Sequence, residues 1–262
     1  MTHEGLDITD QRAVYTTVSS FKPDYIINAA AHTAVDRAEE EVELSYAINR
    51  DGPQYLAEAA QQVNAVILHI STDYVFDGEG ETPYLESDKT APQGVYGKSK
   101  LAGELAVAQS CAKHLILRTA WVFGEHGNNF VKTMLRVAQA RDELSIVGDQ
   151  FGGPTYAGDI ANALITMIEY IEKGQQPKWG TYHFSGMPYA SWYDFASQIF
   201  KLAESKGVLN KQPKLSSIPS SAYPTPAKRP ENSRLYSRKI ENQFGIKPSD
   251  WNAALENIQA YK

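Results

Sequence analysis

The sequence predicts an α/β fold in which parallel strands are joined by crossover helices. Short, wholly apolar segments alternate along the chain with longer amphipathic ones, the pattern that this fold produces. The composition agrees, because 42% of the 262 residues are hydrophobic and 21% are charged, which is ordinary for a globular protein with a large core. No apolar segment approaches the ~20 residues that a membrane-spanning helix needs, and we expect neither a secretory signal nor an anchor.

Each element is predicted from its own pattern. Residues 7–10 (DITD) offer N-caps for a helix whose apolar residues recur at helical spacing until Lys22 precedes a proline. The unbroken apolarity of 65–70 predicts a strand that is buried on both faces. Gly52 and Pro53 predict a kink or a new start inside a helix. Further strands are predicted at 25–27 and 114–123, further helices at 45–63, 97–110, 130–140, 157–173 and 192–206, and a surface loop rich in Pro and Ser at 207–234.

Charge and cysteine content exclude several classes of partner. The net charge of -6 and the pI of about 5.6 argue against a nucleic-acid or anionic-membrane surface, because either requires a strong cationic field. An anionic ligand must therefore be met by a local group of Lys and Arg side chains. The single cysteine, Cys111, can form neither an internal disulfide nor a cysteine-rich metal site. It is expected at a buried helix end, which fits a cytoplasmic protein.

The first chemical candidate is the pair Tyr96 and Lys100, which are one helical turn apart and therefore share a helix face. A phenol with a pKa of about 10 is a poor acid–base group at neutral pH, and an adjacent ammonium favours the phenolate and lowers that pKa. A chain with this many Tyr and Lys residues contains about one such pair by chance. The spacing alone is therefore no evidence of a site.

The place of the pair in the predicted fold is better evidence. Tyr96 and Lys100 open a helix directly after a loop, and Thr72 and Asp73 stand at the end of the buried strand 65–70. In an open parallel sheet, the strand ends and the starts of the following helices face the ligand crevice. We therefore predict that the two segments converge on one site.

These residues also carry a family resemblance. Thr72, Tyr96 and Lys100 resemble the catalytic Ser/Thr, Tyr and Lys of the extended short-chain dehydrogenases/reductases. Longer segments narrow the resemblance to the dTDP-4-dehydrorhamnose reductase family and span the chain from its first residues to its C-terminus; HTAVD and YPTPAxRPxxSxL are the most specific. The matching segments are NAAAHTAVDRAE (28–39), HISTDYVFDG (69–78), VYGKSKLAGE (95–104), RTAWVFG (118–124), NNFVKTML (128–135), DQFGGPT (149–155) and YPTPAKRPENSRL (223–235).

The resemblance implies a Rossmann-like, doubly wound parallel sheet, with residues 1–143 as the dinucleotide-binding domain and 144–262 mainly as a smaller, interleaved substrate-binding lobe. It implies reduction of the C4 ketone of dTDP-4-dehydro-L-rhamnose to dTDP-L-rhamnose, the last step of dTDP-rhamnose biosynthesis, with NADPH or NADH as hydride donor. A homodimer, a Mg²⁺ ion to which no residue is assigned, and the O-antigen of lipopolysaccharide as a destination of the rhamnose stay open.

The resemblance also gives roles to single residues. Tyr96 would donate a proton to the developing alkoxide, and Lys100 would lower the phenol pKa and hydrogen-bond the nicotinamide ribose. Thr72 would hold the substrate carbonyl oxygen. The implied cofactor-binding residues are Asp7, Ile8, Ala31, His32, Thr33, Tyr96 and Lys100, and the implied substrate-binding residues are Thr72, Asp73, Trp121, Lys228, Arg229 and Arg234.

Without the resemblance, simpler interpretations are available for several of these residues. The alanines at 29–31 are typical of tight helix–sheet packing, and Trp121 is typical of a core residue. The cations of the Pro-rich loop are typical of a solvated surface. The six histidines show no metal-ligand spacing, so no metal is expected. Core packing is expected of the aromatic residues Tyr189, Trp192, Tyr193 and Phe195.

One departure from the family concerns the Gly-rich turn that lays a pyrophosphate on a helix N-terminus. Gly5 is isolated, and matching by motif places Met1 about thirty residues into the family pattern. From the strand order of the fold, we expect the first strands to be missing and the strands at 25–28 and 65–70 to have unpaired edges. We therefore expect weak cofactor binding and a tendency to aggregate.

Two alternative functions stay open. A non-catalytic regulatory or binding subunit on the same scaffold would not need the phosphate-binding turn. Another nucleotide-sugar reductase or epimerase would share the three catalytic residues but not the YPTPA segment. The presence of all three of Thr72, Tyr96 and Lys100 favours an enzyme.

Overall fold

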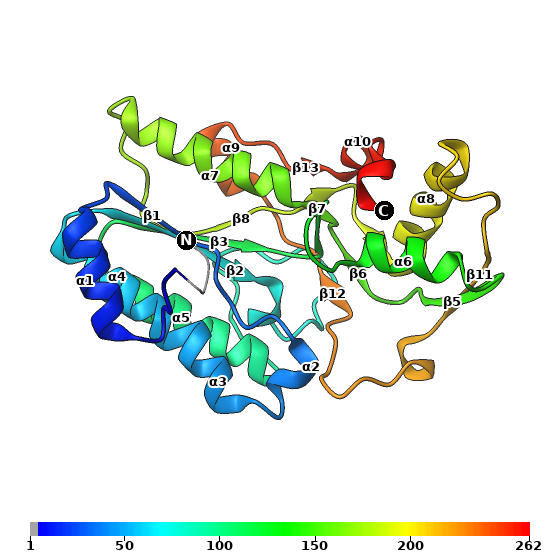
Figure 1. Ribbon diagram of the computed structural model, residues 1–262, viewed down its shortest axis with the longest axis horizontal. Coiled ribbons are helices and arrows are strands. Elements are labelled where there is room, and N and C mark those ends of the chain that lie inside the picture. The colour runs from blue at the N-terminus through cyan, green and yellow to red at the C-terminus, as the bar shows by residue number, and fades with distance from the viewer. Residues whose placement is uncertain (1–4) are drawn as a thin grey trace.

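The computed structural model describes residues 5–262. At its centre is a parallel sheet of four strands in the order β1-β2-β3-β8. Helices cover both faces of this sheet (Figure 1), which confirms the predicted α/β, doubly wound arrangement. The strands are β1 (Tyr25–Asn28), β2 (Val66–Thr72), β3 (His114–Thr119) and β8 (Gly180–His183); the covering helices are α1 (Gln11–Phe21), α4 (Gly52–Gln62) and α5 (Val95–Ser110) on one face and α7 (Ala157–Glu172) and α9 (Arg238–Phe244) on the other.

Alternate side chains of the strands enter two separate cores. Ile67 of β2 packs with α1, α4 and α5, whereas its neighbours Val66 and Leu68 pack with α7 and α9. This division follows from strand geometry, in which successive side chains point to opposite faces. Strand β2 is therefore buried on both faces, as its apolar sequence predicts.

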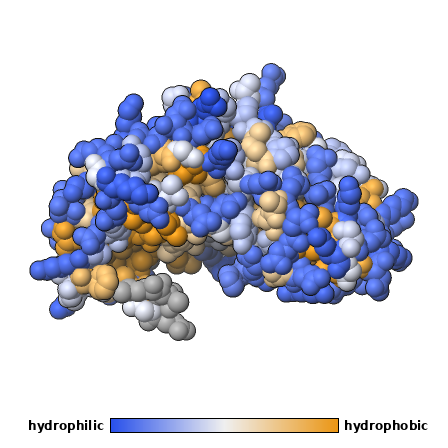
Figure 2. All heavy atoms as spheres, turned by 90° about the horizontal axis from the view of Figure 1, so that it is seen from above, coloured by the Kyte–Doolittle hydropathy of each residue, from blue (hydrophilic) through white to orange (hydrophobic). Residues whose placement is uncertain are grey.

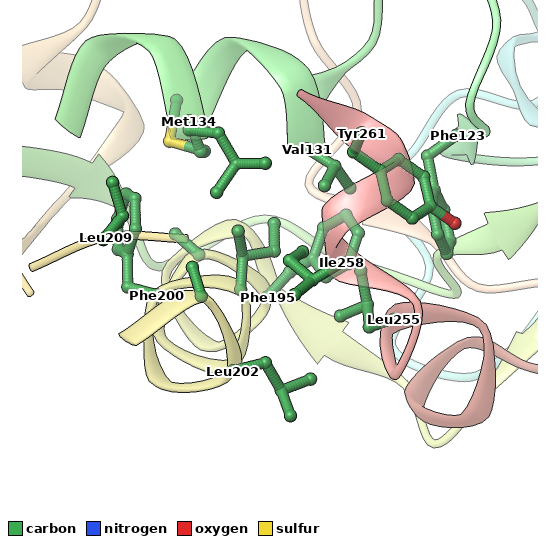
Figure 3. Close-up of a cluster of buried hydrophobic side chains, with 14 of the residues drawn as sticks. Phe123, Val131, Met134, Phe195, Phe200, Leu202, Leu209, Leu255, Ile258 and Tyr261 are labelled. Atoms are coloured by element: carbon green, nitrogen blue, oxygen red, sulfur yellow. The ribbon is translucent and has the colours of Figure 1, made fainter. Parts of the chain in front are cut away.

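A third core holds the second lobe together (Figure 3). It lies between α6 (Phe130–Ala138), α8 (Trp192–Ser205) and the C-terminal segment with α10 (Trp251–Leu255). Phe195 of α8 is fully buried there, as predicted. The lobes exchange elements, because α6 precedes residue 144 and packs in this third core, whereas β8 follows it and extends the central sheet.

The remaining elements are short. Strand β5 (Glu143–Val147) pairs in parallel with β11 (Lys214–Ile218) at the rim of the second lobe. The others are α2 (Val35–Ala38), α3 (Val42–Tyr46), β4 (Val122–Phe123), β6 (Phe151–Gly152), β7 (Thr155–Tyr156), β9 (Gly186–Met187), β10 (Ala190–Ser191), β12 (Asn232–Ser233) and β13 (Ser249–Asp250).

Local signals explain most helix boundaries. The Asp10 carboxylate accepts a hydrogen bond from the Ala13 amide at the start of α1, and Lys22 ends that helix in the left-handed conformation. The predicted break near Gly52 is present: a π-helical turn occupies Ala47–Asp51, and α4 starts directly after it. Cys111 is buried and caps the end of α5, as predicted.

Two predicted boundaries differ from the structure. The strand predicted at 114–123 is interrupted, because Trp121 has a φ of 50° and separates β3 from β4. The segment predicted as a loop at 207–234 contains β11 and β12. Strand β11 was not predicted because its sequence, KLSSI, lacks the apolar alternation of a half-buried strand. The strand is mostly exposed.

The expectation of two unpaired strand edges is wrong for β2. Strand β2 pairs with β1 on one side and with β3 on the other, so the four strands form an uninterrupted sheet. Strand β1 lies at the edge, where the Ile27 side chain is 48% exposed. Within residues 5–262, helices of the length and apolarity needed to cross a bilayer are absent.

Candidate active site

The carboxyl end of β2 and the first turn of α5 meet, as the parallel topology predicts. Thr72 is the last residue of β2 and is buried. Its hydroxyl donates a hydrogen bond to Asp73 Oδ1 (3.1 Å), and a further hydrogen bond joins it to the Tyr96 phenol. The ring of Tyr74 packs edge-on against that of Tyr96, with 5.3 Å between centroids. The structure thus brings together two of the three predicted catalytic side chains in direct contact.

Tyr96 is held as a neutral phenol. Burial raises the pKa of Tyr96, and the negative charge of Asp73 adds to this effect, while the hydrogen bond with Thr72 counters it. A phenol with a raised pKa carries its proton throughout the neutral range. This direction is opposite to the lowering expected from Lys100, whose ammonium is not among the groups that shift the pKa of Tyr96.

Lys100 lies one turn further along α5 and is 2% exposed. Its ammonium donates a hydrogen bond to the backbone carbonyl of Ile70 (2.7 Å) on β2. Burial lowers the pKa of Lys100 to about 8, and the Glu104 carboxylate opposes that shift. An ammonium can donate three hydrogen bonds, and this contact uses one of them.

Asp73 is a buried carboxyl beside Thr72. Burial raises the pKa of Asp73 to about 6, although the hydroxyls of Ser233 and Thr72 favour its charged form. Its Oδ2 atom and Ser233 Oγ are both buried without a hydrogen bond of normal geometry among the described residues, although Ser233 lies close enough to favour the carboxylate. A buried polar atom left without a partner costs free energy, which a bound polar ligand would recover.

Two residues that sequence reasoning missed fix the position of α5. A Cβ on Gly97 would lie 2.2 Å from the carbonyl oxygen of Tyr74, so only glycine allows this close approach. Asn49 is fully buried, and its side chain bonds the amide of His32 (2.8 Å) and the hydroxyl of Ser99 (3.0 Å). Asn49 therefore ties the segment after β1 to the catalytic helix. Gly97 stands out in sequence as a glycine inside a helix, but nothing marks Asn49.

A groove of about 1030 Å³ runs along β1. Its walls are mostly apolar and include Asp7, Ile8, Asn28, Ala29, Ala30 and Ala31. Figure 2 shows hydrophobic surface in the half of the molecule that contains this sheet. The groove thus contains three of the predicted cofactor-binding residues.

Two other predicted cofactor-binding residues lie beyond those walls. The ring of His32 contacts Glu41 (Nε2 to Oε2, 2.9 Å) and Ser45 (Nδ1 to Oγ, 3.0 Å), so its side chain is already engaged. Thr33 follows it and is exposed. The backbone of His32 is engaged as well, because its amide donates to Asn49 Oδ1 and its carbonyl accepts from Asn49 Nδ2.

Trp121, a predicted substrate-binding residue, lies between β3 and β4 and is partly buried. Its ring stacks on that of Trp192 at 3.5 Å between centroids and 10° between planes. A Cβ on Gly152 would lie 2.5 Å from the Trp121 ring, so glycine leaves the space that this ring occupies. Trp192, expected to serve core packing, thus also supports a predicted substrate-binding side chain.

The three predicted cations have separate partners. Lys228 forms an ion pair with Glu79 (2.7 Å), and Arg229 forms one with Asp36 (2.6 Å). Arg234 instead donates to neutral acceptors, the side-chain oxygen of Asn232 (2.8 Å) and the carbonyl of Glu81 (2.6 Å). Among the described residues no carboxylate pairs with Arg234, so of the three cations it is the one whose charge is not already balanced by an ion pair.

The described residues show no group of three or more His, Cys, Asp or Glu side chains that could hold a metal ion. The groups gathered at the end of β2 are the hydroxyl of Thr72, the phenol of Tyr96 and the buried carboxyl of Asp73, with the Lys100 ammonium one turn along α5. Such a set can hold a carbonyl oxygen, donate a proton to it and bind an anion nearby.

Comparison with known proteins gives likenesses over nearly the whole chain. Residues 1–261 match a family model described as RmlD substrate binding domain. The chain is 55% identical over 256 residues to the dTDP-4-dehydrorhamnose reductase of Aggregatibacter actinomycetemcomitans, covering 98% of this chain and 87% of the relative. It is 45% identical over 252 residues to that of Escherichia coli (strain K12), covering 96% and 84%. The crystal structure of the Bacillus anthracis dTDP-4-dehydrorhamnose reductase in complex with NADP superposes with a TM-score of 0.90 at 36% identity, covering 100% of this chain and 89% of that one.

Proposed function

The chain belongs to the family of the RmlD substrate binding domain, and from this membership we propose that it is an NAD(P)H-dependent dTDP-4-dehydrorhamnose reductase. It reduces the C4 ketone of dTDP-4-dehydro-L-rhamnose to dTDP-L-rhamnose. The observation that carries the proposal is the meeting of Thr72 and Tyr96 at the end of β2, with Lys100 one turn along the same helix. A reductase requires these groups, whereas a purely regulatory subunit does not.

The groove beside β1 fits an elongated nicotinamide cofactor. Its volume of about 1030 Å³ is sufficient for a large ligand, and the small side chains at 29–31 allow close approach to the backbone. Asp7 and Ile8 would hold the adenine end, and Ala31, followed by His32 and Thr33, would lie beside the middle of the cofactor. When bound, the cofactor supplies the hydride that reaches C4.

Side chains of the protein bind the ketone oxygen and donate a proton to it. The Thr72 hydroxyl turns from Asp73 to the carbonyl oxygen and holds it, and Tyr96 donates its proton to that oxygen as negative charge develops. Lys100, charged below about pH 8, then stabilises the phenolate left on Tyr96. The unpartnered Oδ2 of Asp73 accepts a hydrogen bond from a sugar hydroxyl.

Turnover tests the proposal directly. We expect the purified chain to oxidise NADPH or NADH in the presence of dTDP-4-dehydro-L-rhamnose and to form dTDP-L-rhamnose, with cofactor supplied well above its dissociation constant. Cofactor binding without turnover would favour the regulatory subunit. Turnover of a different nucleotide sugar alone would favour the other reductase or epimerase.

Arg234 is expected to bind the nucleotide diphosphate, with Trp121 beside the sugar. Arg234→Gln should raise the KM for the dTDP-sugar about 10-fold or more, because a hydrogen bond to a charged group contributes about 1.5–3 kcal/mol. The KM for cofactor and the kcat should change little. Lys228→Gln, which removes a cation already paired with Glu79, should have a smaller effect. An unchanged substrate KM for Arg234→Gln would make Arg234 a surface residue.

A further inference from the structure

A buried polar cluster joins α5 to the two strands behind the candidate active site. Arg118 on β3 donates to both carboxylate oxygens of Glu104, from Nε to Oε1 (2.9 Å) and from Nη2 to Oε2 (2.7 Å). Ser71 on β2, paired in register with Arg118, donates its hydroxyl to the same carboxylate (2.5 Å). The three side chains are between 3% and 5% exposed. One carboxylate on α5 is therefore fixed to two adjacent strands.

The cluster continues away from α5 through the guanidinium. Arg118 Nη1 contacts Nε2 of His183 on β8 (3.5 Å), and Nδ1 of His183 contacts the carbonyl of Tyr84 (3.1 Å). Burial and the adjacent guanidinium lower the pKa of His183 to about 3, so this ring is neutral and accepts from Arg118. The guanidinium also lies over the ring of Phe76, 5.0 Å from its centroid. Arg118 therefore has little freedom to follow a displaced Glu104.

The cluster lies directly next to the reacting groups. Glu104 is one helical turn after Lys100 on the buried face of α5, and Ser71 immediately precedes Thr72. A bidentate carboxylate–guanidinium pair is geometrically specific, and removing one partner of such a buried pair leaves an uncompensated buried charge. A slide or rotation of α5 relative to β2 would break these contacts. The same motion would separate Tyr96 from Thr72.

We propose that Glu104 is a positioning residue: anchored by Arg118 and Ser71, its carboxylate fixes the register of α5 against β2 and β3 and provides the counter-charge for the buried Lys100 ammonium. The proposal rests on the roles given to Tyr96 and Lys100 in the proposed reduction. Glu104 does not touch substrate or cofactor and acts through these two residues.

The charged and titratable groups around Lys100 are few. On its own helix they are Tyr96 and Glu104, and on β2 the nearest is His69, which burial and the ammonium hold neutral by lowering its pKa. On β3 the Arg118 guanidinium binds the Glu104 carboxylate, and removing that carboxylate would leave a second positive charge without its partner. Asp73 lies past the end of β2, beside Tyr96. Glu104 is thus the carboxylate that opposes the effect of burial on Lys100. Its removal must lower the pKa of Lys100, because the charged form loses a favourable interaction.

Direct titration of Lys100 tests this role without relying on turnover. In protein labelled with ¹³Cε-lysine, the Lys100 resonance, identified by its absence in Lys100→Met, should titrate near pH 8. In Glu104→Gln the midpoint should fall by about one pH unit. Glu169→Gln, which removes the partner of the exposed Lys173, should leave it unchanged. An unchanged midpoint in Glu104→Gln would overturn the proposal, since a merely structural contact does not predict this shift.

Turnover provides the second measurement. In Glu104→Gln the kcat should fall and its decline at high pH should begin at lower pH, in the same direction as the Lys100 midpoint. Ser71→Ala leaves no charge unpaired and should therefore fold even if Glu104→Gln does not. Its kcat should fall roughly 3- to 10-fold with little change in substrate KM, as expected for one lost hydrogen bond. A normal kcat in Ser71→Ala would equally overturn the proposal. If the unaltered chain shows no reductase activity, the proposed function fails while the titration still decides the role of Glu104.

Discussion

Tyr96→Phe should lower the kcat for reduction of dTDP-4-dehydro-L-rhamnose roughly 10²-fold or more, the usual scale for loss of a general acid. The phenol is the proton donor that the site supplies, and its raised pKa keeps it protonated at neutral pH. The ring of Tyr96 would remain, including its edge-on contact with Tyr74. Substrate KM and the folded structure should therefore change little, and steady-state kinetics with circular dichroism would show both.

A matched control is Tyr170→Phe on α7, which removes a hydroxyl that accepts a hydrogen bond from the Gln243 side chain. This variant should retain normal turnover. Near-normal turnover of Tyr96→Phe would exclude Tyr96 as the proton donor. A loss that the Tyr170 variant shares would point to a general effect on folding.

Gly97→Ala should cause a comparable loss through geometry alone. The added methyl would lie 2.2 Å from the carbonyl oxygen of Tyr74, a backbone atom that cannot move aside as a side chain can. Helix α5 must therefore shift away from β2, taking Tyr96 and Lys100 with it. A displacement of about 1 Å at a reacting group costs on the order of 10²-fold in rate, and overpacking costs about 1–3 kcal/mol of stability. Thermal unfolding and kcat measured on the same preparation would show both effects.

Gly124→Ala is the control for this substitution. Its added Cβ meets only the methyl group of Ala157, at 3.1 Å, so stability should change less and kcat should remain close to normal. If Gly97→Ala is as stable and as active as the unaltered chain, the close contact between α5 and the turn after β2 does not position the catalytic groups.

The meeting of Thr72 with Tyr96 was predictable because two local patterns and one general rule were sufficient. A wholly apolar segment predicts β2, a loop followed by helical spacing predicts α5, and parallel topology brings the strand end and the helix start to one edge. The prediction did not require knowing which distant segments of the chain pair with one another. The same reasoning explains why the cores on both faces of the sheet were predictable.

Features that depend on contacts between distant segments were not predictable. Trp121 has a left-handed backbone conformation and interrupts an apolar segment whose sequence predicts a single strand. Its position is explained only by contacts with distant residues, the stacked ring of Trp192 and the adjacent Gly152. Asn49 and Glu104 resemble ordinary polar residues of amphipathic helices until their partners are known. The neighbours of β2 depended on strand order, which local sequence does not determine.

The exchange of elements between the lobes has a consequence for the folding of the chain. Strand β8, which completes the central sheet, and helices α7 and α9, which cover one of its faces, all follow residue 150 in the sequence. A nascent chain that has emerged only as far as β5 therefore exposes one apolar face of β2 and β3 with nothing to cover it. Because contacts of large sequence separation form slowly, folding of this sheet must wait until synthesis is nearly complete, and both lobes then become ordered together.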